Sequence, residues 1–208
     1  MSEGRVYLFK RFERFWHWSQ ALLVITMLYT GFAIHGYLPM GGFRGTLLLH
    51  ELAAVLLVTL WVFAIFWHFT TGEWKQYIPS AENLGAIARY YAFGIFSGAS
   101  HPYEVTAQRK HNPLQRLAYL GVKLVINPLI WFSGALLLLF AWNLIDAMPL
   151  GLSLRDAALL HTAAAYMMLI FFIVHVYLAT TGHSPLSYIR AMITGWEDSE
   201  DAHHGAQS

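Results

Sequence analysis

Residues 161–175 read HTAAAYMMLIFFIVH, and this stretch decides the fold. Its two histidines, His161 and His175, enclose a run without a charged residue. A separation of 14 positions is close to four helical turns, so on a helix the two rings point about 40° apart and lie about 21 Å apart along the axis. The hydrocarbon layer of a bilayer is about 30 Å thick, which puts one imidazole near each side of it. Because ionisable side chains are costly inside a membrane, both are candidates for a functional site.

The composition also favours a membrane protein. The chain has 208 residues, of which 57% are apolar and 12% charged, whereas soluble domains carry about 25% charged residues. It contains no cysteine, which excludes disulfides, a thiolate nucleophile and an iron–sulfur cluster held by this chain. The formal net charge of +1 gives no indication of nucleic-acid binding, and no nucleic-acid partner is expected.

Four apolar runs are long enough to cross a bilayer, which takes about 20 helical residues. They cover residues 15–35, 47–71, 117–141 and 157–181. Membranes are spanned only by helices or closed barrels, and these runs lack the short alternating pattern of barrel strands. The sequence therefore predicts an all-α, integral membrane four-helix bundle that forms one domain over residues 1–196.

Two segments outside these runs have predictable character. Ser80 is a candidate N-cap for an amphipathic helix over residues 81–96, which would lie on the cytoplasmic membrane surface. A plain connector helix is the alternative for this segment. The tail, residues 197–208, is acidic and contains histidines, and it is predicted to be disordered.

Lysine and arginine are distributed asymmetrically about the four runs. Of the 13 Lys and Arg residues, only Arg44 and Arg155 fall in the loops on the side opposite the N-terminus. The positive-inside rule therefore places both termini in the cytoplasm. The two loops on the opposite side are short, so chemistry on that side would belong to a partner protein.

Four histidines fall at matching depths in this topology. His17 and His175 lie in the cytoplasmic half, and His50 and His161 lie in the periplasmic half. Two imidazole pairs on three helices are what two bis-histidine haems need, since neutral imidazole is a good metal ligand and bundle cores hold such cofactors. Gly31, 14 positions after His17, would leave room for the periplasmic macrocycle, or it serves helix packing alone.

His68 is the competing iron ligand. It lies at the cytoplasmic end of the second run, where it could replace His17 or His175. The alternative is an interfacial histidine in an aromatic cluster with Trp67 and Phe69.

Three short motifs resemble the integral cytochrome b subunits of respiratory complexes. They are Arg14-Phe15-Trp16-His17-Trp18 in the first run, Lys110-His111-Asn112-Pro113-Leu114-Gln115 before the third, and Ala191-Met192-Ile193-Thr194-Gly195 after the fourth. The group comprises the gamma subunit of membrane formate dehydrogenase, the cytochrome b of nickel–iron hydrogenase and the cytochrome b of thiosulfate reductase. The resemblance covers nearly the whole chain.

The resemblance implies an electron-transfer subunit of the bacterial inner membrane with two haem b groups and no substrate chemistry of its own. By position, His50 and His161 would ligate the periplasmic haem, and His17 and His175 the cytoplasmic one. Electrons would pass between a quinone (menaquinone or ubiquinone) and a periplasmic or membrane-associated partner that carries a catalytic, iron–sulfur or multihaem centre.

A quinone site near the cytoplasmic haem is also implied by the resemblance. It would involve Asn112, with Gln115, His111 and His175 nearby. His111 stands where the family usually has tyrosine.

Two functions of other classes stay open at this point. One is a transporter or channel whose membrane histidines relay protons or bind a metal, and the other is a structural anchor for a peripheral enzyme. A proton relay would also call for acidic residues inside the bundle, and the four runs carry almost none. No motif identifies the partner, its substrate or the direction of electron flow.

Overall fold

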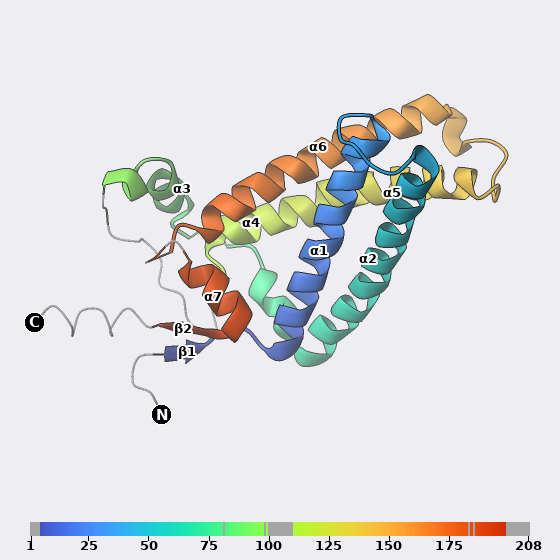
Figure 1. The fold of residues 1–208 in the computed structure, drawn as a ribbon. Helices are drawn as coiled ribbons and strands as arrows, with labels where there is room; N and C mark the ends of the chain where they lie inside the picture. Colours follow the sequence, from blue (N-terminus) through green and yellow to red (C-terminus); the bar gives the residue numbers. More distant parts are fainter. Residues whose placement is uncertain are drawn as a thin grey trace, which may run out of the picture. The chain divides into compact units, whose positions relative to one another are not determined.

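The protein is described here by a computed structural model, which covers residues 5–80, 82–97, 99, 110–182, 184 and 186–198. In chain order the elements are β1 (Arg5–Tyr7), α1 (Arg11–Ile34), α2 (Phe43–Thr71), η1 (Glu73–Tyr77), α3 (Leu84–Ala92), η2 (Gly94–Ser97), α4 (Pro113–Gly121), η3 (Val122–Ile126), α5 (Asn127–Ala141), η4 (Pro149–Gly151), α6 (Leu154–Ala179), α7 (Ser187–Thr194) and β2 (Trp196–Asp198) (Figure 1). The described chain is mostly helical, as the apolar runs predict.

Three stretches of helix in the described residues are long and apolar enough to cross a membrane. They are Phe43–Thr71, Pro113–Ala141 and Leu154–Ala179, with 29, 29 and 26 residues. They contain the second, third and most of the fourth predicted spans, and each begins three or four residues earlier than predicted. Their large apolar side chains face outward: Phe63, Phe66 and Phe69 of α2 are 62%, 67% and 67% exposed. Such apolar surfaces can face the lipid chains of a bilayer, whose core contains no water.

The first predicted span is helical as well, up to Ile34, where α1 ends after 24 residues. This helix is not among the three apolar enough to qualify by composition. Even the part of α1 without charged residues contains polar ones, among them His17, Ser19 and Gln20, and these lower its mean hydropathy.

The chain divides into two compact units, each made of several chain segments. The first unit comprises Met1–Gln20, Val62–Ala118 and His175–Ser208, and the second comprises Ala21–Trp61 and Tyr119–Val174. The first unit therefore holds the start of α1, the end of α2, α3, α7 and the two strands. The second holds the rest of α1 and α2, together with η3, α5 and most of α6.

Side chains cap helix starts in both units. Ser153 donates its backbone N–H to Asp156 Oδ2 at 2.9 Å, and Asp156 returns a backbone N–H to Ser153 Oγ at 3.1 Å, which satisfies the first turn of α6. At α1, the backbone N–H of Lys10 donates to Glu13 Oε2 at 2.7 Å. These polar groups fix where the apolar helices begin.

The third predicted span contains a π-helical turn, η3, between α4 and α5. Pro128 follows directly, at the start of α5. Proline lacks a backbone N–H and its ring crowds the carbonyl four residues earlier, so a widened turn before it is the expected accommodation. The predicted span is thus helical throughout, with one irregular turn.

The connector helix and the tail need correction. The helix predicted over 81–96 begins at Leu84, after Asn83 in a left-handed conformation, and its α-helical part ends at Ala92. Ser80 does not cap it; the Ser80 hydroxyl accepts the N–H of Glu82 at 3.3 Å, in the turn before. Burial of Ile87 and Tyr91 confirms that one face of α3 is covered.

The predicted disordered tail begins too early. Its first two residues, Glu197 and Asp198, belong to β2, which pairs antiparallel with β1 so that Val6 lies opposite Glu197. Gly195 makes this return possible: it ends α7 with a positive φ of 91°, and a side chain there would come within 2.6 Å of the Tyr7 ring. Residues 199–208, the rest of the predicted tail, lie outside the described residues.

Candidate functional site

The second unit brings His50 of α2 and His161 of α6 together. Their ring centroids lie 6.2 Å apart, with the planes inclined at 77°. The sequence predicted these two histidines as one pair from their depth alone. His50 lies on α2, directly before Glu51, and His161 lies on α6 between Leu160 and Thr162.

Each of these imidazoles has a hydroxyl group at its Nδ1 atom. Thr30 Oγ1 lies 2.8 Å from Nδ1 of His50, and Ser133 Oγ lies 3.2 Å from Nδ1 of His161. The carbonyl of Ile130 also lies 3.2 Å from Nδ1 of His161. Both hydroxyl residues are completely buried. With Nδ1 engaged in this way, Nε2 is the nitrogen available to a ligand.

Two glycines lie beside these rings. A methyl group on Gly134 would stand 3.1 Å from Cε1 and 3.3 Å from Nδ1 of His161, closer than side chains normally approach. At Gly31 a methyl group would meet Cε1 of His50 at 3.9 Å, an ordinary contact. The position of His161 therefore requires a glycine at Gly134, which the sequence reasoning missed. A methyl group at Gly31 would fit without displacing His50.

The first unit brings His17 of α1 and His175 of α6 together. Their ring centroids lie 6.1 Å apart, with the planes inclined at 47°. The ring of Trp18 stands edge-on to His17 at 5.1 Å. Nδ1 of His17 is buried and has no hydrogen-bond partner among the residues that the structure describes.

Both pairs have the separation that a shared metal ion needs. Metal–imidazole bonds are about 2.0–2.1 Å long, and a ring nitrogen lies about 1.2 Å from its centroid, so imidazoles on opposite sides of one ion have centroids about 6.4 Å apart. The described residues contain no group of three or more His, Cys, Asp or Glu that could hold an ion by itself. A pair of imidazoles therefore suits an ion whose other ligands come from a macrocycle, which describes haem iron.

His68, the alternative ligand, lies in an aromatic cluster. Its ring stands edge-on to Trp16, Trp67 and Tyr77, with centroid distances of 5.1, 5.0 and 5.5 Å. Its Nδ1 lies 2.6 Å from the carbonyl of Ala64, one helical turn earlier. The cluster differs from the predicted one in membership: Tyr77 and Trp16 join Trp67.

Phe69, the other predicted member of the cluster, instead has its ring centroid 6.3 Å from that of Trp74, with the planes inclined at 30°.

Asn112 and Gln115, predicted near a quinone, form a reciprocal cap at the start of α4. The backbone N–H of Asn112 donates to Gln115 Oε1 at 2.9 Å, and that of Gln115 donates to Asn112 Oδ1 at 2.8 Å. The remaining amide group of Asn112 donates to the hydroxyl of Tyr91 at 3.0 Å. Asn112 is 3% exposed. Its bond to Tyr91 joins the start of α4 to α3 within the first unit.

Two further residues lie next to Asn112: Tyr91 accepts its amide N–H, and His111 precedes it in the sequence. Burial raises the pKa of Tyr91 to about 12, and Tyr90 adds to the shift, so the phenol keeps its proton at neutral pH. His111 lies with its ring 5.2 Å from Tyr77. The four residues predicted at the quinone, which include His175, all belong to the first unit.

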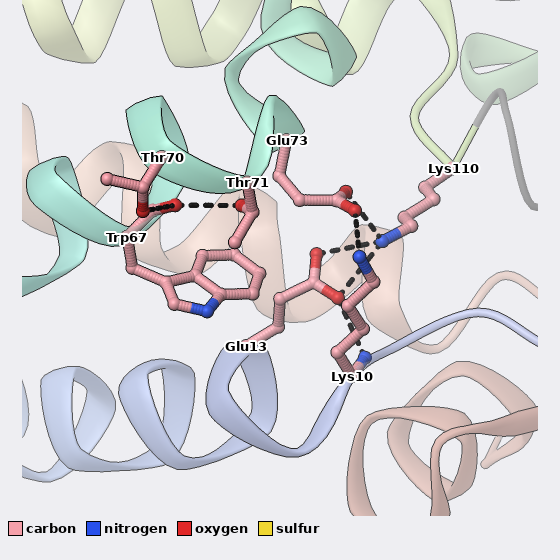
Figure 2. A network of polar contacts seen from close by, with 7 residues as sticks. All are labelled: Lys10, Glu13, Trp67, Thr70, Thr71, Glu73 and Lys110. Atoms are coloured by element: carbon pink, nitrogen blue, oxygen red, sulfur yellow. Dashed lines mark hydrogen bonds and ion pairs between the residues drawn. The ribbon is translucent and has the colours of Figure 1, made fainter.

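A partly buried ion cluster, which the sequence reasoning did not predict, also lies in the first unit (Figure 2). Nζ of Lys110 donates to Glu13 Oε1 at 2.9 Å and to Glu73 Oε2 at 3.1 Å, and Nζ of Lys10 pairs with Glu73 Oε1 at 2.6 Å. The hydrogen bond to Glu73 raises the pKa of Lys10. The two cations and two carboxylates balance, which makes burial of Lys110 tolerable.

Comparisons with known proteins agree with one another. A family described as prokaryotic cytochrome b561 matches residues 8–195. A protein of Escherichia coli (strain K12), named "Putative cytochrome YdhU", is 32% identical over 198 residues, which is 92% of this chain and 74% of that protein. No solved structure matches the chain.

Proposed function

The chain belongs to the prokaryotic cytochrome b561 family, whose members are membrane proteins that bind b-type haem and transfer electrons, and we propose that it is a di-haem subunit linking an oxidoreductase partner to the quinone pool. The observation that carries the proposal is the presence of two imidazole pairs, with centroids 6.1 and 6.2 Å apart. His17 and His175 would hold one haem, and His50 and His161 the other.

Haem b, when bound, supplies reversible one-electron chemistry at its iron. Two histidines would bind each iron, and ligation by two side chains favours electron transfer over binding of oxygen. Gly31 and Gly134 keep side-chain atoms away from the rings of His50 and His161. The apolar helices exclude water from the sites and limit access to small carriers in the membrane.

The quinone would react in the first unit, where Asn112, Gln115, His111 and His175 are found. A buried amide and an imidazole can both hydrogen-bond a quinone carbonyl. Because Asn112 already caps α4 and bonds Tyr91, its contribution would be to orient Tyr91 and the start of α4 as well as to contact quinone. The quinone is menaquinone or ubiquinone.

The distribution of basic residues supports a bacterial inner-membrane protein with both termini in the cytoplasm. The quinone site would then lie on the cytoplasmic side, and the partner with its catalytic, iron–sulfur or multihaem centre would dock on the periplasmic side. An electron moving inward against the membrane potential costs about 2.3 kcal/mol per 100 mV. The redox reaction of the partner would have to supply that energy.

The direct test is spectroscopy of the full-length protein purified in detergent. We expect a sharp α-band on dithionite reduction, two haem b per chain by the pyridine haemochrome assay, and reduction of haem by a quinol. A folded, colourless protein would contradict the haem sites and favour a transporter or a structural anchor. Two haems without any reaction with quinol would contradict the quinone assignment alone.

A further inference from the structure

The hydrogen-bond directions around His50 and His161 are fixed by chemistry. Thr30 Oγ1 lies 2.7 Å from the carbonyl of Thr26 and 3.2 Å from that of Met27, in its own helix. A hydroxyl has one proton, and carbonyls only accept. The proton of Thr30 therefore points to its own helix, and its oxygen accepts from Nδ1–H of His50.

The same reasoning applies to the second imidazole. Ser133 Oγ donates to the carbonyl of Leu129 at 2.7 Å, with that of Ile130 at 3.3 Å. Nδ1 of His161 faces both this hydroxyl oxygen and the carbonyl of Ile130, at 3.2 Å each. Because a carbonyl cannot donate, Nδ1 of His161 carries the proton.

We propose that Thr30 and Ser133 are positioning residues that hold His50 and His161 as Nδ1–H donors and thereby lower the reduction potential of the iron that these histidines bind. The inference rests on the proposed haem function. A hydrogen bond donated by Nδ1 increases the electron density at Nε2, which makes the imidazole a more basic ligand. A more basic ligand stabilises ferric over ferrous iron, so the one-electron reduction becomes less favourable.

The burial of both hydroxyls supports a role in tuning. Thr30 and Ser133 are each 0% exposed, so no water competes for the bond to the ring. They come from α1 and α5, two helices that provide no ligand to this pair. The pair is thus held from four helices, two that carry imidazoles and two that carry acceptors.

His17, a member of the other pair, provides an internal reference. Nδ1 of His17 is buried without a hydrogen-bond partner among the described residues, so no such hydroxyl acts on it there. Changes at Thr30 or Ser133 should therefore affect one haem and leave the other as it is.

The test is a redox titration of the full-length protein in detergent, followed by the α-band absorbance of each haem. Thr30→Val should weaken the preference for ferric iron about tenfold, which raises one midpoint potential by about 59 mV for a one-electron couple. Ser133→Ala should raise the same potential by less, because the carbonyl of Ile130 still accepts from Nδ1 of His161. The second potential should stay unchanged. Thr26→Val and Thr162→Val are matched controls, because those hydroxyls bond only carbonyls of their own helices, at 2.8 and 2.9 Å.

Replacement of Thr30 by serine distinguishes the effect of its hydroxyl group from that of its methyl group. Thr30→Ser keeps the acceptor and should keep both haems and both wild-type potentials. If Thr30→Val loses one haem while Thr30→Ser retains both, the positioning role is supported. The inference is overturned if both potentials are unchanged in Thr30→Val and Ser133→Ala, or if Thr30→Ser behaves as Thr30→Val does. Absence of haem from the wild-type protein would instead contradict the proposed function.

Discussion

Lys110 Nζ donates hydrogen bonds to both carboxylate oxygens of Glu13, at 2.9 and 3.0 Å, although the two residues are 97 positions apart. Their side chains are only 4% and 8% exposed. The pair ties the start of α1 to the segment that leads into α4 (Figure 2). His17 lies on α1, and Asn112 stands directly before α4.

Removing the cation should therefore destabilise the first unit. Lys110→Met leaves the Glu13 carboxylate buried without its cation, which costs about 3–5 kcal/mol in comparable buried pairs. We expect a clear fall in the midpoint of thermal unfolding, measured by circular dichroism in detergent. Glu13→Gln in the same chain should recover part of the loss, because no buried charge is then left unpaired.

Lys75→Met is the control for this substitution, since Lys75 is exposed. An equal, small effect of the two substitutions would show that the ion cluster does not stabilise the fold.

The stability should also depend on pH through Glu73. Burial alone would raise the pKa of Glu73, but hydrogen bonds from Lys10 and Lys110 outweigh it and leave the pKa below its ordinary value of 4.5. A carboxyl with a depressed pKa contributes stability above its unfolded-state pKa and loses it as the pH falls through the folded-state pKa. Wild type should thus exceed Glu73→Gln in unfolding temperature at pH 6, and the difference should shrink as the pH falls below the ordinary pKa of 4.5. A difference that is constant over this range would rule out the ionised carboxylate as its cause.

Gly134→Ala should disturb one haem site. The added methyl group would lie 3.1 Å from the ring of His161, so the ring or α5 has to move. We expect the haem held by His50 and His161 to be lost or to change its absorbance spectrum. Gly45→Ala on α2 is the control, since nothing lies within 4 Å of a methyl group there. Identical spectra for the two variants would argue against the close approach of His161 to α5.

Asn112→Asp tests the quinone site while keeping the helix cap. The aspartate can still accept the N–H of Gln115, but it cannot donate to the hydroxyl of Tyr91 as the amide does. We expect full haem content in this variant. A quinol should reduce its haem about tenfold more slowly, because the loss of a hydrogen bond worth about 1.4 kcal/mol changes a rate by that factor. The measurement is stopped-flow absorbance, with Asn143→Asp as the exposed control. An unchanged rate would exclude Asn112 from the quinone reaction.

The helices and the histidine pairs could be predicted because both depend on local periodicity. An apolar run of membrane length has few alternatives to a helix, and a fixed spacing on a helix determines the side on which each ring lies. The start of α4 was also encoded: Asn112, Pro113 and Gln115 form the pattern of a capped helix with proline at its first position. Asn112 and Gln115 of this cap are also the residues to which the resemblance assigns a quinone role.

Other features depend on contacts between distant segments. Ser133 and Gly134 are ordinary small residues of an apolar helix, and only their contact with His161 distinguishes them. The pairing of Lys110 with Glu13 joins a loop to a helix start, and no spacing rule connects them. The pairing of β1 with β2 likewise links the two ends of the described chain.

The central claim is that four particular histidines hold two haems, and haem counting in single variants tests it most directly. His17→Ala, His50→Ala, His161→Ala and His175→Ala should each contain one haem per chain by the pyridine haemochrome assay, and the wild type two. His68→Ala should keep both, because His68 lies in the aromatic cluster with Trp16 and Tyr77. Two haems retained in any of the four ligand variants, or one lost in His68→Ala, would contradict the assignment.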